Sequence, residues 1–258
     1  MIIEKIIVCF FAGLAAGVGT GFAGMSAAAV IAPMLSCFLG IPIYEAIGIG
    51  LISDVLASLV SAYNYKRSGN LDIKNSLVML ITVLVLTILG SLIGSFVKED
   101  VMNSTVQIAM IIIGLRFIIK PINKKVESIS IVSQKQKIIK SLIGGIIIGF
   151  ICGFIGAGGG MMMLFVLTSF LGYPLHMAVG TSVFIMAFTA LTGGISHFVI
   201  GGIPDLLSLI LSVTFTFVFA QMASRIANKS EPKLLNRIVG VVLISTSIVI
   251  LVVNNLLK

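Results

Sequence analysis

The chain has 258 residues, of which 58% are hydrophobic and only 10% charged, with a formal net charge of +8. A soluble domain carries about 25% charged residues, so this sequence is too poor in charge to cover a surface in water and predicts a protein solvated by lipid. The Lys and Arg residues lie almost wholly between apolar runs, which is typical of membrane topology and argues against nucleic-acid binding.

The sequence contains an internal duplication. A shift of 132 residues aligns 13–72 with 145–204 without a gap. Most identical pairs are glycine or proline, which fix backbone shape rather than mere hydrophobicity. These pairs include Gly17/Gly149, Gly21/Gly153, Gly24/Gly156, Gly40/Gly172, Pro42/Pro174 and Gly48/Gly180. Two copies of one structural unit are therefore predicted.

Each copy contains five apolar segments. They run over 2–20, 26–39, 44–63, 75–97 and 101–119 in the first copy, and over 138–156, 160–171, 176–200, 204–227 and 235–256 in the second. Most approach the roughly 20 residues that a helix needs to cross the hydrocarbon. The second segment of each copy is too short, so it either re-enters or spans a thinned region. The sequence predicts an all-α polytopic membrane protein with 8–10 membrane helices.

Charge predicts the topology of these segments. Positive residues cluster in the gaps 64–74, 116–140 and 225–237. An odd number of crossings in each copy places all three clusters on one side, which the positive-inside rule assigns to the cytoplasm. Both termini then lie outside and the two copies are inverted relative to each other. The predicted organisation is a first repeat at 1–120, a cytoplasmic linker at 121–137 and a second repeat at 138–258.

One glycine-rich run interrupts each copy, at 17–24 and at 153–160. Broken helices in lipid persist where protein or water satisfies the freed backbone groups, and their half-helix N-termini direct amides toward anionic substrates. The predicted substrate-binding residues are Gly19, Thr20, Gly21, Gly24 and Ser26 in the first copy, and Gly156, Gly158, Gly159 and Gly160 in the second. The alternative is close helix packing through a GxxxG ladder at Gly13, Gly17 and Gly21.

Polar residues on the long helices extend this candidate site. Thr181 and Ser182 follow the second break, and their hydroxyls could bind the oxygens of an anion or their own backbone. Asp54 lies near the middle of the 44–63 helix, where a lone carboxylate is costly. Proton coupling is one candidate role for it, and a neutral or hydrogen-bonded structural Asp is the alternative.

Three other polar residues are candidates for coupling or gating. They are Ser53, Asn64 and His197, for which contacts between helices or an interfacial position are the alternatives. Neither a catalytic group nor a metal ligand set nor a cofactor motif is predicted, because the three cysteines form no CxxC and the chain has only two histidines. An ion gradient, with H⁺ as the candidate ion, or the gradient of the substrate itself is the expected energy source.

The two glycine-rich runs resemble the TauE/SafE family of membrane permeases. The resemblance also includes Pro174-Leu-His-Met-Ala-Val-Gly-Thr-Ser182, His197 with Gly201, and Tyr65-Lys-Arg-Ser-Gly-Asn-Leu-Asp72. It covers nearly the whole chain and implies transport of a sulfur-containing anion, such as sulfite, thiosulfate, sulfoacetate or another sulfonate, across the bacterial inner membrane. The first copy departs from the family pattern, with Ser26-Ala-Ala-Ala in place of a glycine run and Ile49-Gly50 where Thr-Ser is usual.

These observations predict a secondary transporter rather than an enzyme. A small anion would cross by alternating access at a midplane site between the repeats. The alternatives are a passive anion channel and, less favoured, an intramembrane enzyme, because membrane carboxylates are not paired. The expected partners are the anion, H⁺ and the lipid bilayer; the oligomeric state is open, with a homodimer as one option.

Overall fold

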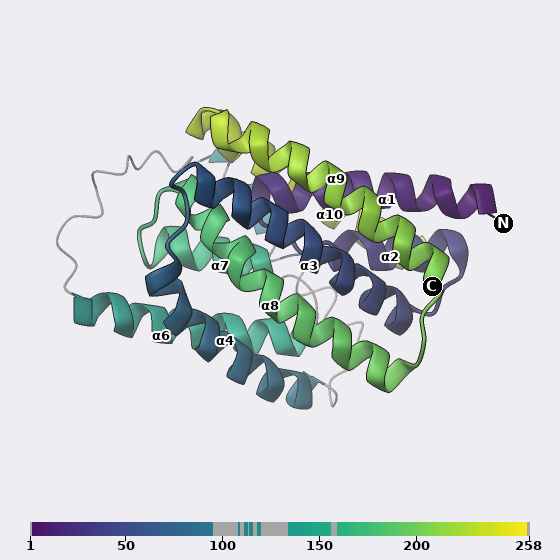
Figure 1. Cartoon of the computed structure of the whole chain (residues 1–258), viewed down its shortest axis with the longest axis horizontal. Coiled ribbons are helices and arrows are strands. Elements are labelled where there is room, and N and C mark those ends of the chain that lie inside the picture. The colour runs from purple at the N-terminus through teal and green to yellow at the C-terminus, as the bar shows by residue number, and fades with distance from the viewer. Residues whose placement is uncertain are drawn as a thin grey trace.

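The computed structural model describes residues 2–94, 134–155 and 159–256, together with a few positions between 108 and 119. Its described residues form helices and no strands (Figure 1). The helices are α1 (Ile2–Ala23), α2 (Ala28–Leu39), α3 (Ile43–Arg67), α4 (Ile73–Gly94), α6 (Gln134–Ile155), α7 (Gly159–Ser169), α8 (Leu175–Gly201), α9 (Leu206–Lys229) and α10 (Pro232–Leu256).

Four of these helices, α1, α3, α8 and α9, are long and apolar enough to cross a membrane. The helices α2 and α7 have 12 and 11 residues. At 1.5 Å per residue they reach about 18 Å, well short of the roughly 30 Å hydrocarbon core. The predicted all-α membrane architecture is confirmed, although the segment 101–119 lies largely outside the described residues.

The second repeat begins earlier than expected. Helix α6 starts at Gln134, inside the stretch 121–137 that the sequence assigns to a linker. Positions 121–133 lie outside the described residues. Their polar composition still separates two apolar halves, but the boundary of the second half moves to the start of α6.

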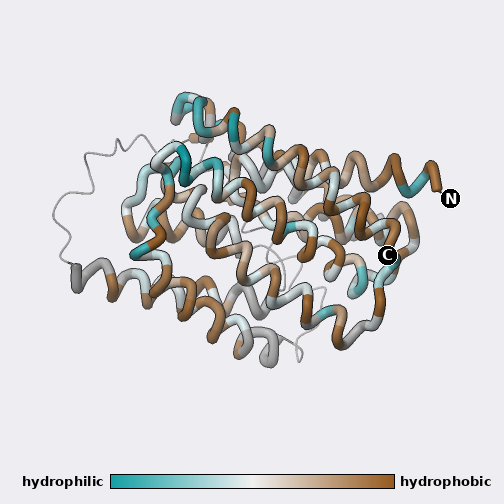
Figure 2. Tube along the Cα trace, in the orientation of Figure 1, coloured by the Kyte–Doolittle hydropathy of each residue, from teal (hydrophilic) through white to brown (hydrophobic). Residues whose placement is uncertain are grey.

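Most helices are rich in apolar residues along their length (Figure 2), and many of the large apolar side chains are exposed on the outside of the bundle. Large aliphatic side chains are strongly exposed on α1, including Ile3 at 73%, and on α9, including Ile210 at 62%. Water would penalise a surface of this kind, whereas lipid tails match it. These exposed faces are therefore the lipid-facing faces.

Small residues bring two pairs of parallel helices close together. Gly13 and Gly21 of α1 lie against Phe215 and Ala223 of α9, so the two helices run in the same direction. In α6, Gly145 and Gly149, the equivalents of Gly13 and Gly17, lie against Thr82 and Val83 of α4. In the duplication α1 corresponds to α6 and α4 corresponds to α9. The α1–α9 pair is therefore equivalent to the α6–α4 pair. One helix interface therefore occurs twice in the fold.

The long helices α3 and α8 are counterparts in the duplication and lie antiparallel at the centre (Figure 1). Gly48 near the start of α3 contacts Phe198 near the end of α8. At the opposite end, Gly180 of α8 contacts Tyr65 of α3. Equivalent helices of the two copies thus run in opposite directions at this central contact.

The positive clusters lie at one end of the bundle. Asn70 Nδ2 donates to Asn228 Oδ1 over 2.9 Å, which joins the segment after α3 to the end of α9. Helix α6 also starts at this end, because it runs parallel to α4. The gaps 64–74 and 225–237, with their Lys and Arg residues, are consequently on the same side, as the charge pattern predicts.

Candidate functional site

The first break lies later than the glycine run predicts. Helix α1 continues to Ala23, and the chain turns at Gly24, whose φ of 62° is the left-handed conformation that favours glycine. The turn is held by Thr20 Oγ1, which donates to the Met25 carbonyl over 2.8 Å. Helix α2 then begins at Ala28. The break is therefore the four residues 24–27, which we call the first tip.

The earlier glycines of the run are helical. Gly17 faces the Thr216 carbonyl and the Ala220 amide of α9, so there is no room for a side chain. Gly21 packs against Ala223, and its carbonyl accepts from the Tyr65 hydroxyl over 3.0 Å. The prediction that 17–24 breaks the helix is wrong for these positions, where the packing alternative holds.

Gly19 also lies inside α1, beside the Met25 side chain. Its amide, like that of Gly21, belongs to a continuous helix and is not exposed by a break. The structure thus places the donors of the first copy further along the chain than Gly19 and Gly21.

The first tip presents amides to the protein interior that make no helical hydrogen bond among the described residues. Within the described ranges, no backbone carbonyl accepts from the amides of Ser26, Ala27 or Ala28, and the first such bond runs from the Ala29 amide to the Ser26 carbonyl at 3.2 Å. Ser26, Ala27 and Ala28 are at most 4% exposed. The start of α2 therefore offers the partial positive charge of a helix N-terminus away from bulk water.

Asp54 of α3 faces this N-terminus. It is fully buried, and its Oδ1 accepts from Ser58 Oγ over 3.0 Å. Its Oδ2 makes no hydrogen bond to any residue that the structure describes. The Ser26 hydroxyl, the Ala27 amide and the Thr20 hydroxyl are close enough to act on the carboxylate electrostatically. Asp54 and the first tip thus form one buried polar cluster.

The second break meets the first tip. Helix α6 ends at Ile155 and α7 begins at Gly159, while Gly156 and Gly158 lie outside the described residues. Gly160 is buried, and a Cβ added there would overlap the Gly24 carbonyl oxygen. The first tip and the start of α7 are therefore in contact.

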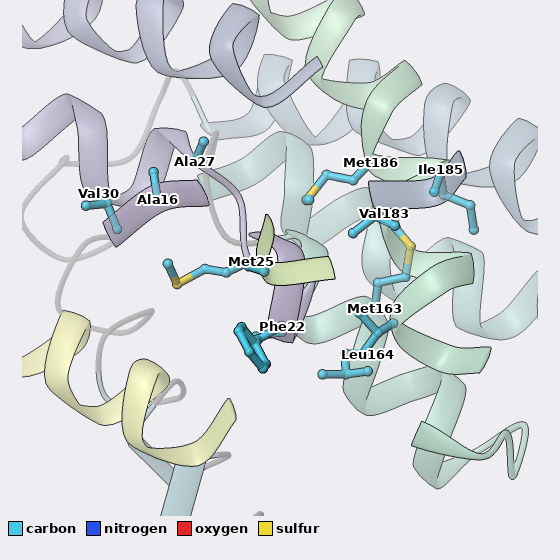
Figure 3. Close-up of a cluster of buried hydrophobic side chains, with 14 of the residues drawn as sticks. Ala16, Phe22, Met25, Ala27, Val30, Met163, Leu164, Val183, Ile185 and Met186 are labelled. Carbon is cyan, nitrogen blue, oxygen red and sulfur yellow. The ribbon is translucent and has the colours of Figure 1, made fainter. Parts of the chain in front are cut away.

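Apolar side chains surround the junction of the two breaks. Figure 3 shows Met25 of the first tip and Phe22 apart from the α8 residues Val183 and Met186, and all four belong to one buried apolar cluster. The Met186 sulfur lies directly beside Gly160. Met186 is the duplication partner of Asp54. Helix α2 thus begins beside Asp54 of α3, and α7 begins beside the equivalent Met186 of α8. The side chain at this position is a carboxylate in the first copy and a thioether in the second.

Ser182 lies at this junction, whereas Thr181 points elsewhere. Ser182 Oγ is against the α-carbon of Gly24 and donates to the Val179 carbonyl over 2.8 Å. Thr181 Oγ1 accepts from the Asp72 amide at 3.3 Å, which ties it to the connection between α3 and α4.

Ser53 and Asn64 make contacts within or between helices. Ser53 Oγ donates to the Ile49 carbonyl of its own helix over 2.8 Å. Asn64 Nδ2 donates to Ser224 Oγ over 2.8 Å and so joins α3 to α9. Neither residue forms a hydrogen bond with the first tip in the described part of the chain, and the contact of Asn64 matches the interhelical alternative.

His197 lies toward the far end of α8. Its Nδ1 is 3.1 Å from the Tyr44 carbonyl, and the two rings are 4.2 Å apart between centroids. His197 follows Ser182 by fifteen residues of one helix, a separation of about 22 Å along the axis. It is therefore remote from the junction of the two breaks.

Ser58 was not among the predicted site residues. Its position four residues after Asp54 on one helix was a usable signal, because such residues lie on the same helix face. The amides of Ala27 and Ala28 were hidden from sequence reasoning by a run of alanines that reads as ordinary helix.

The family model of the sulfite exporter TauE/SafE matches residues 9–250. The chain belongs to the TauE/SafE family. This TauE/SafE chain is 27% identical over 256 residues to "Probable membrane transporter protein YunE" of Bacillus subtilis (strain 168), a match that covers 90% of this chain and 92% of the relative. It is 24% identical to "Probable membrane transporter protein YdhB" of the same organism, with 82% and 86% covered.

No solved structure matches the TauE/SafE chain with significance. Family membership and the apolar spanning helices together identify it as a multi-pass membrane transporter.

Proposed function

We propose that this transporter carries a small sulfur-containing anion, such as sulfite, thiosulfate, sulfoacetate or another sulfonate, through the junction of its two breaks. The observation that carries the proposal is the contact between Gly24 of the first tip and Gly160 at the start of α7. It brings two helix N-termini toward one place inside the bilayer. Amides at such ends bind anions without a cationic side chain.

The chemistry of the junction suits a sulfur oxoanion. Such an anion offers several acceptor oxygens and no donors when ionised. The junction offers the amides of Ser26, Ala27 and Ala28 as donors. The Ser182 hydroxyl would join them by exchanging its bond to the Val179 carbonyl for one to the anion. The apolar side chains around it would exclude water and strengthen these interactions. A polarisable thioether at Met186 is also compatible with a sulfur-bearing solute.

Alternating access between inverted repeats is the proposed mechanism. The antiparallel contact of α3 and α8 and the gathering of Lys and Arg at one end support it. In this proposal the positive end faces the cytoplasm of a bacterial cell and both termini face outside. Asp54 is the proposed carrier of a coupling proton.

A counterflow assay tests this function. Proteoliposomes are loaded with unlabelled thiosulfate or sulfite, and uptake of the same anion in radiolabelled form is followed. A carrier produces a transient overshoot of label, because exchange through an alternating site is faster than net efflux. A passive channel gives equilibration without overshoot, and absence of flux with every anion of the proposed class would overturn the proposal.

Two glycine variants locate the site. Gly160→Ala places a Cβ against the backbone of Gly24, so we expect exchange to be lost. Gly193→Ala is the matched control, because a Cβ there meets only the movable Leu51 methyl groups, 3.1 Å and 3.9 Å away. Membrane insertion and size-exclusion profiles of both variants must match the wild type. Full exchange by a well-inserted Gly160→Ala protein would remove the junction as the site.

A further inference from the structure

We propose that the carboxylate of Asp54 and the transported anion occupy the N-terminus of α2 in turn, so that anion and proton are bound together. The inference rests on the proposed function and names its coupling. The N-terminus of α2 already has an anion of the protein beside it. A solute anion can use those amides only when that internal anion is neutralised.

The geometry of Asp54 provides the first argument. The side chain is fully buried, and only Oδ1 is bonded, to Ser58. The Ser26 hydroxyl and the Ala27 amide act on this carboxyl group, and Gly50, one turn earlier on α3, lies against the backbone of Ala28 at the start of α2. A buried polar atom without a partner is costly, so its retention in the bilayer calls for a role. The groups that act on the Asp54 carboxyl are hydroxyl and amide donors, which suits a carboxylate or a competing anion better than a metal cation.

The surroundings of Asp54 contain no counter-charge. Helix α1 contributes Thr20, α2 contributes Ser26 and the Ala27 amide, and α3 itself contributes Ser58. Helix α8 packs near the start of α2 through the apolar Ala190. No ionisable side chain faces Asp54 from the part of the chain that the structure describes.

Helix α9 adds no charge at this depth either. It meets α3 through the neutral pair Asn64 and Ser224, about 15 Å further along α3. Its acidic contact with α3, between Glu45 and the Asp205 amide, lies about 14 Å away in the other direction. Among the described residues, the partial charge of the α2 N-terminus is thus the positive potential nearest to Asp54. Two negative charges at one such end repel strongly where water is excluded.

The duplication supplies an independent argument. The polar groups around Asp54 occur in one copy and are replaced by apolar or small residues at every equivalent position of the other. The pairs are Thr20/Cys152, Ser26/Gly158, Asp54/Met186 and Ser58/Ala190. Four coordinated differences around one side chain show that the first copy has been specialised. In this proposal the charge state of the Asp54 carboxyl decides whether the N-terminus of α2 can bind the solute anion. The N-terminus of α7 has the neutral thioether of Met186 beside it instead.

The direction of coupling follows from this arrangement. Protonation converts the Asp54 carboxylate to a carboxylic acid and frees the amides, and the solute anion takes them. Both then cross together, and both leave on the other side, where loss of the proton restores the carboxylate. The transporter is therefore a proton–anion symporter. A monovalent anion moves with no net charge, and a dianion moves one negative charge.

Calorimetric titration of the purified full-length protein with thiosulfate tests the inference. Thiosulfate keeps its own charge between about pH 5.5 and about pH 8.5, so any change of affinity reports on the protein. We expect the wild-type dissociation constant to rise at least about tenfold across this range. Repeating the titration in buffers of different ionisation enthalpy counts the protons taken up, and we expect a value approaching one per anion at the higher pH. Asp54→Asn should bind with equal affinity at both pH values and take up none.

Asp205→Asn is the matched control, because it makes the same chemical change outside the membrane-spanning helices. It should keep the pH dependence and the proton uptake of the wild type. Binding that is independent of pH and takes up no protons in the wild type would overturn the inference and leave anion transport intact. Absence of thiosulfate binding at every pH would instead count against the proposed function and the inference together.

A second variant covers the case in which Asp54→Asn does not fold. Ser58→Ala removes the hydroxyl that donates to Oδ1 and leaves the helix backbone unchanged. The ionised carboxylate loses a donor, so the pH at which thiosulfate binding falls by half should move upward. An unchanged midpoint in a folded Ser58→Ala protein would contradict the competition.

Discussion

The carbonyl oxygen of Gly24 lies so close to Gly160 that no side chain fits between them. Gly24 belongs to the first copy of the duplication and Gly160 to the second. Their contact joins the two interrupted segments inside a protein whose outer face is apolar. A rearrangement of one repeat against the other must therefore pass through this point, which is where we place the substrate.

Gly17 holds α1 against α9. Gly17→Ala would press a Cβ onto the Thr216 carbonyl and the Ala220 amide, and backbone atoms yield less readily than side chains. We expect a loss of about 1–3 kcal/mol in the free energy of unfolding and a lower Tm in detergent. Gly193→Ala, which meets only side-chain methyl groups, should leave the Tm nearly unchanged. Equal Tm values for the two variants would contradict the close packing of α1 on α9.

Tyr65 fixes the end of α1 from α3. Its buried hydroxyl donates to the Gly21 carbonyl over 3.0 Å. Tyr65→Phe keeps the ring and removes this bond, so we expect a loss of about 1 kcal/mol in unfolding free energy. Thermal unfolding of the purified variant measures it. A Tm as high as that of the wild type would show that the Gly21 carbonyl is satisfied in another way.

Variants of Asn64 distinguish a structural role of this side chain from a role in gating. Asn64→Ala removes the bond to Ser224, and Ser224→Ala removes the same bond from the other side. A double-mutant cycle on unfolding should give a coupling energy of about 0.5–1.5 kcal/mol, as for other bonds between membrane helices. Thiosulfate affinity should be unchanged in both single variants. A large change of affinity with no coupling in stability would indicate that Asn64 acts in transport.

Asp205 gives a pH dependence to stability outside the membrane-spanning helices. Burial acts to raise the pKa of this carboxyl, but hydrogen bonds from Lys5 and Ser208 outweigh burial and hold the pKa below its ordinary value. Since the folded state binds its proton less tightly, the ionised carboxylate stabilises the fold above its ordinary pKa of about 3.9. That contribution disappears as the pH falls through the lowered folded value.

Asp205→Asn removes this charge while leaving a side chain that can still cap α9. The variant should have a slightly lower Tm than the wild type at neutral pH, and the difference should vanish at a pH below about 3. The effect is small because the side chain is 31% exposed and screened by water. A Tm difference that stays constant with pH would show that the charge contributes nothing.

The helices could be predicted from the sequence because they depend on local composition. Nine of the ten predicted apolar runs correspond to helices that the structure describes, whereas the run 101–119 lies largely outside the described residues. The junction could be predicted only in part. Whether a glycine breaks a helix or packs within one depends on its neighbours in space, and those of Gly17 lie about two hundred residues away on α9.

The cluster around Asp54 could likewise be predicted only in part from the sequence. The sequence identifies Asp54 as unusual because it is a lone carboxylate in an apolar helix. It does not tell which amides that carboxylate faces, since the first tip reaches it by a turn at Gly24. The sequence also predicts His197 as a coupling or gating residue, but His197 lies toward the end of α8 beside Tyr44.

The position of bound thiosulfate tests the central claim most directly. Electron cryo-microscopy of the full-length protein with thiosulfate at mildly acidic pH should show density between the starts of α2 and α7. Its oxygens should lie about 3 Å from the amides of Ser26, Ala27 or Ala28. Density for the anion elsewhere in the bundle, with this junction filled only by protein, would contradict the account.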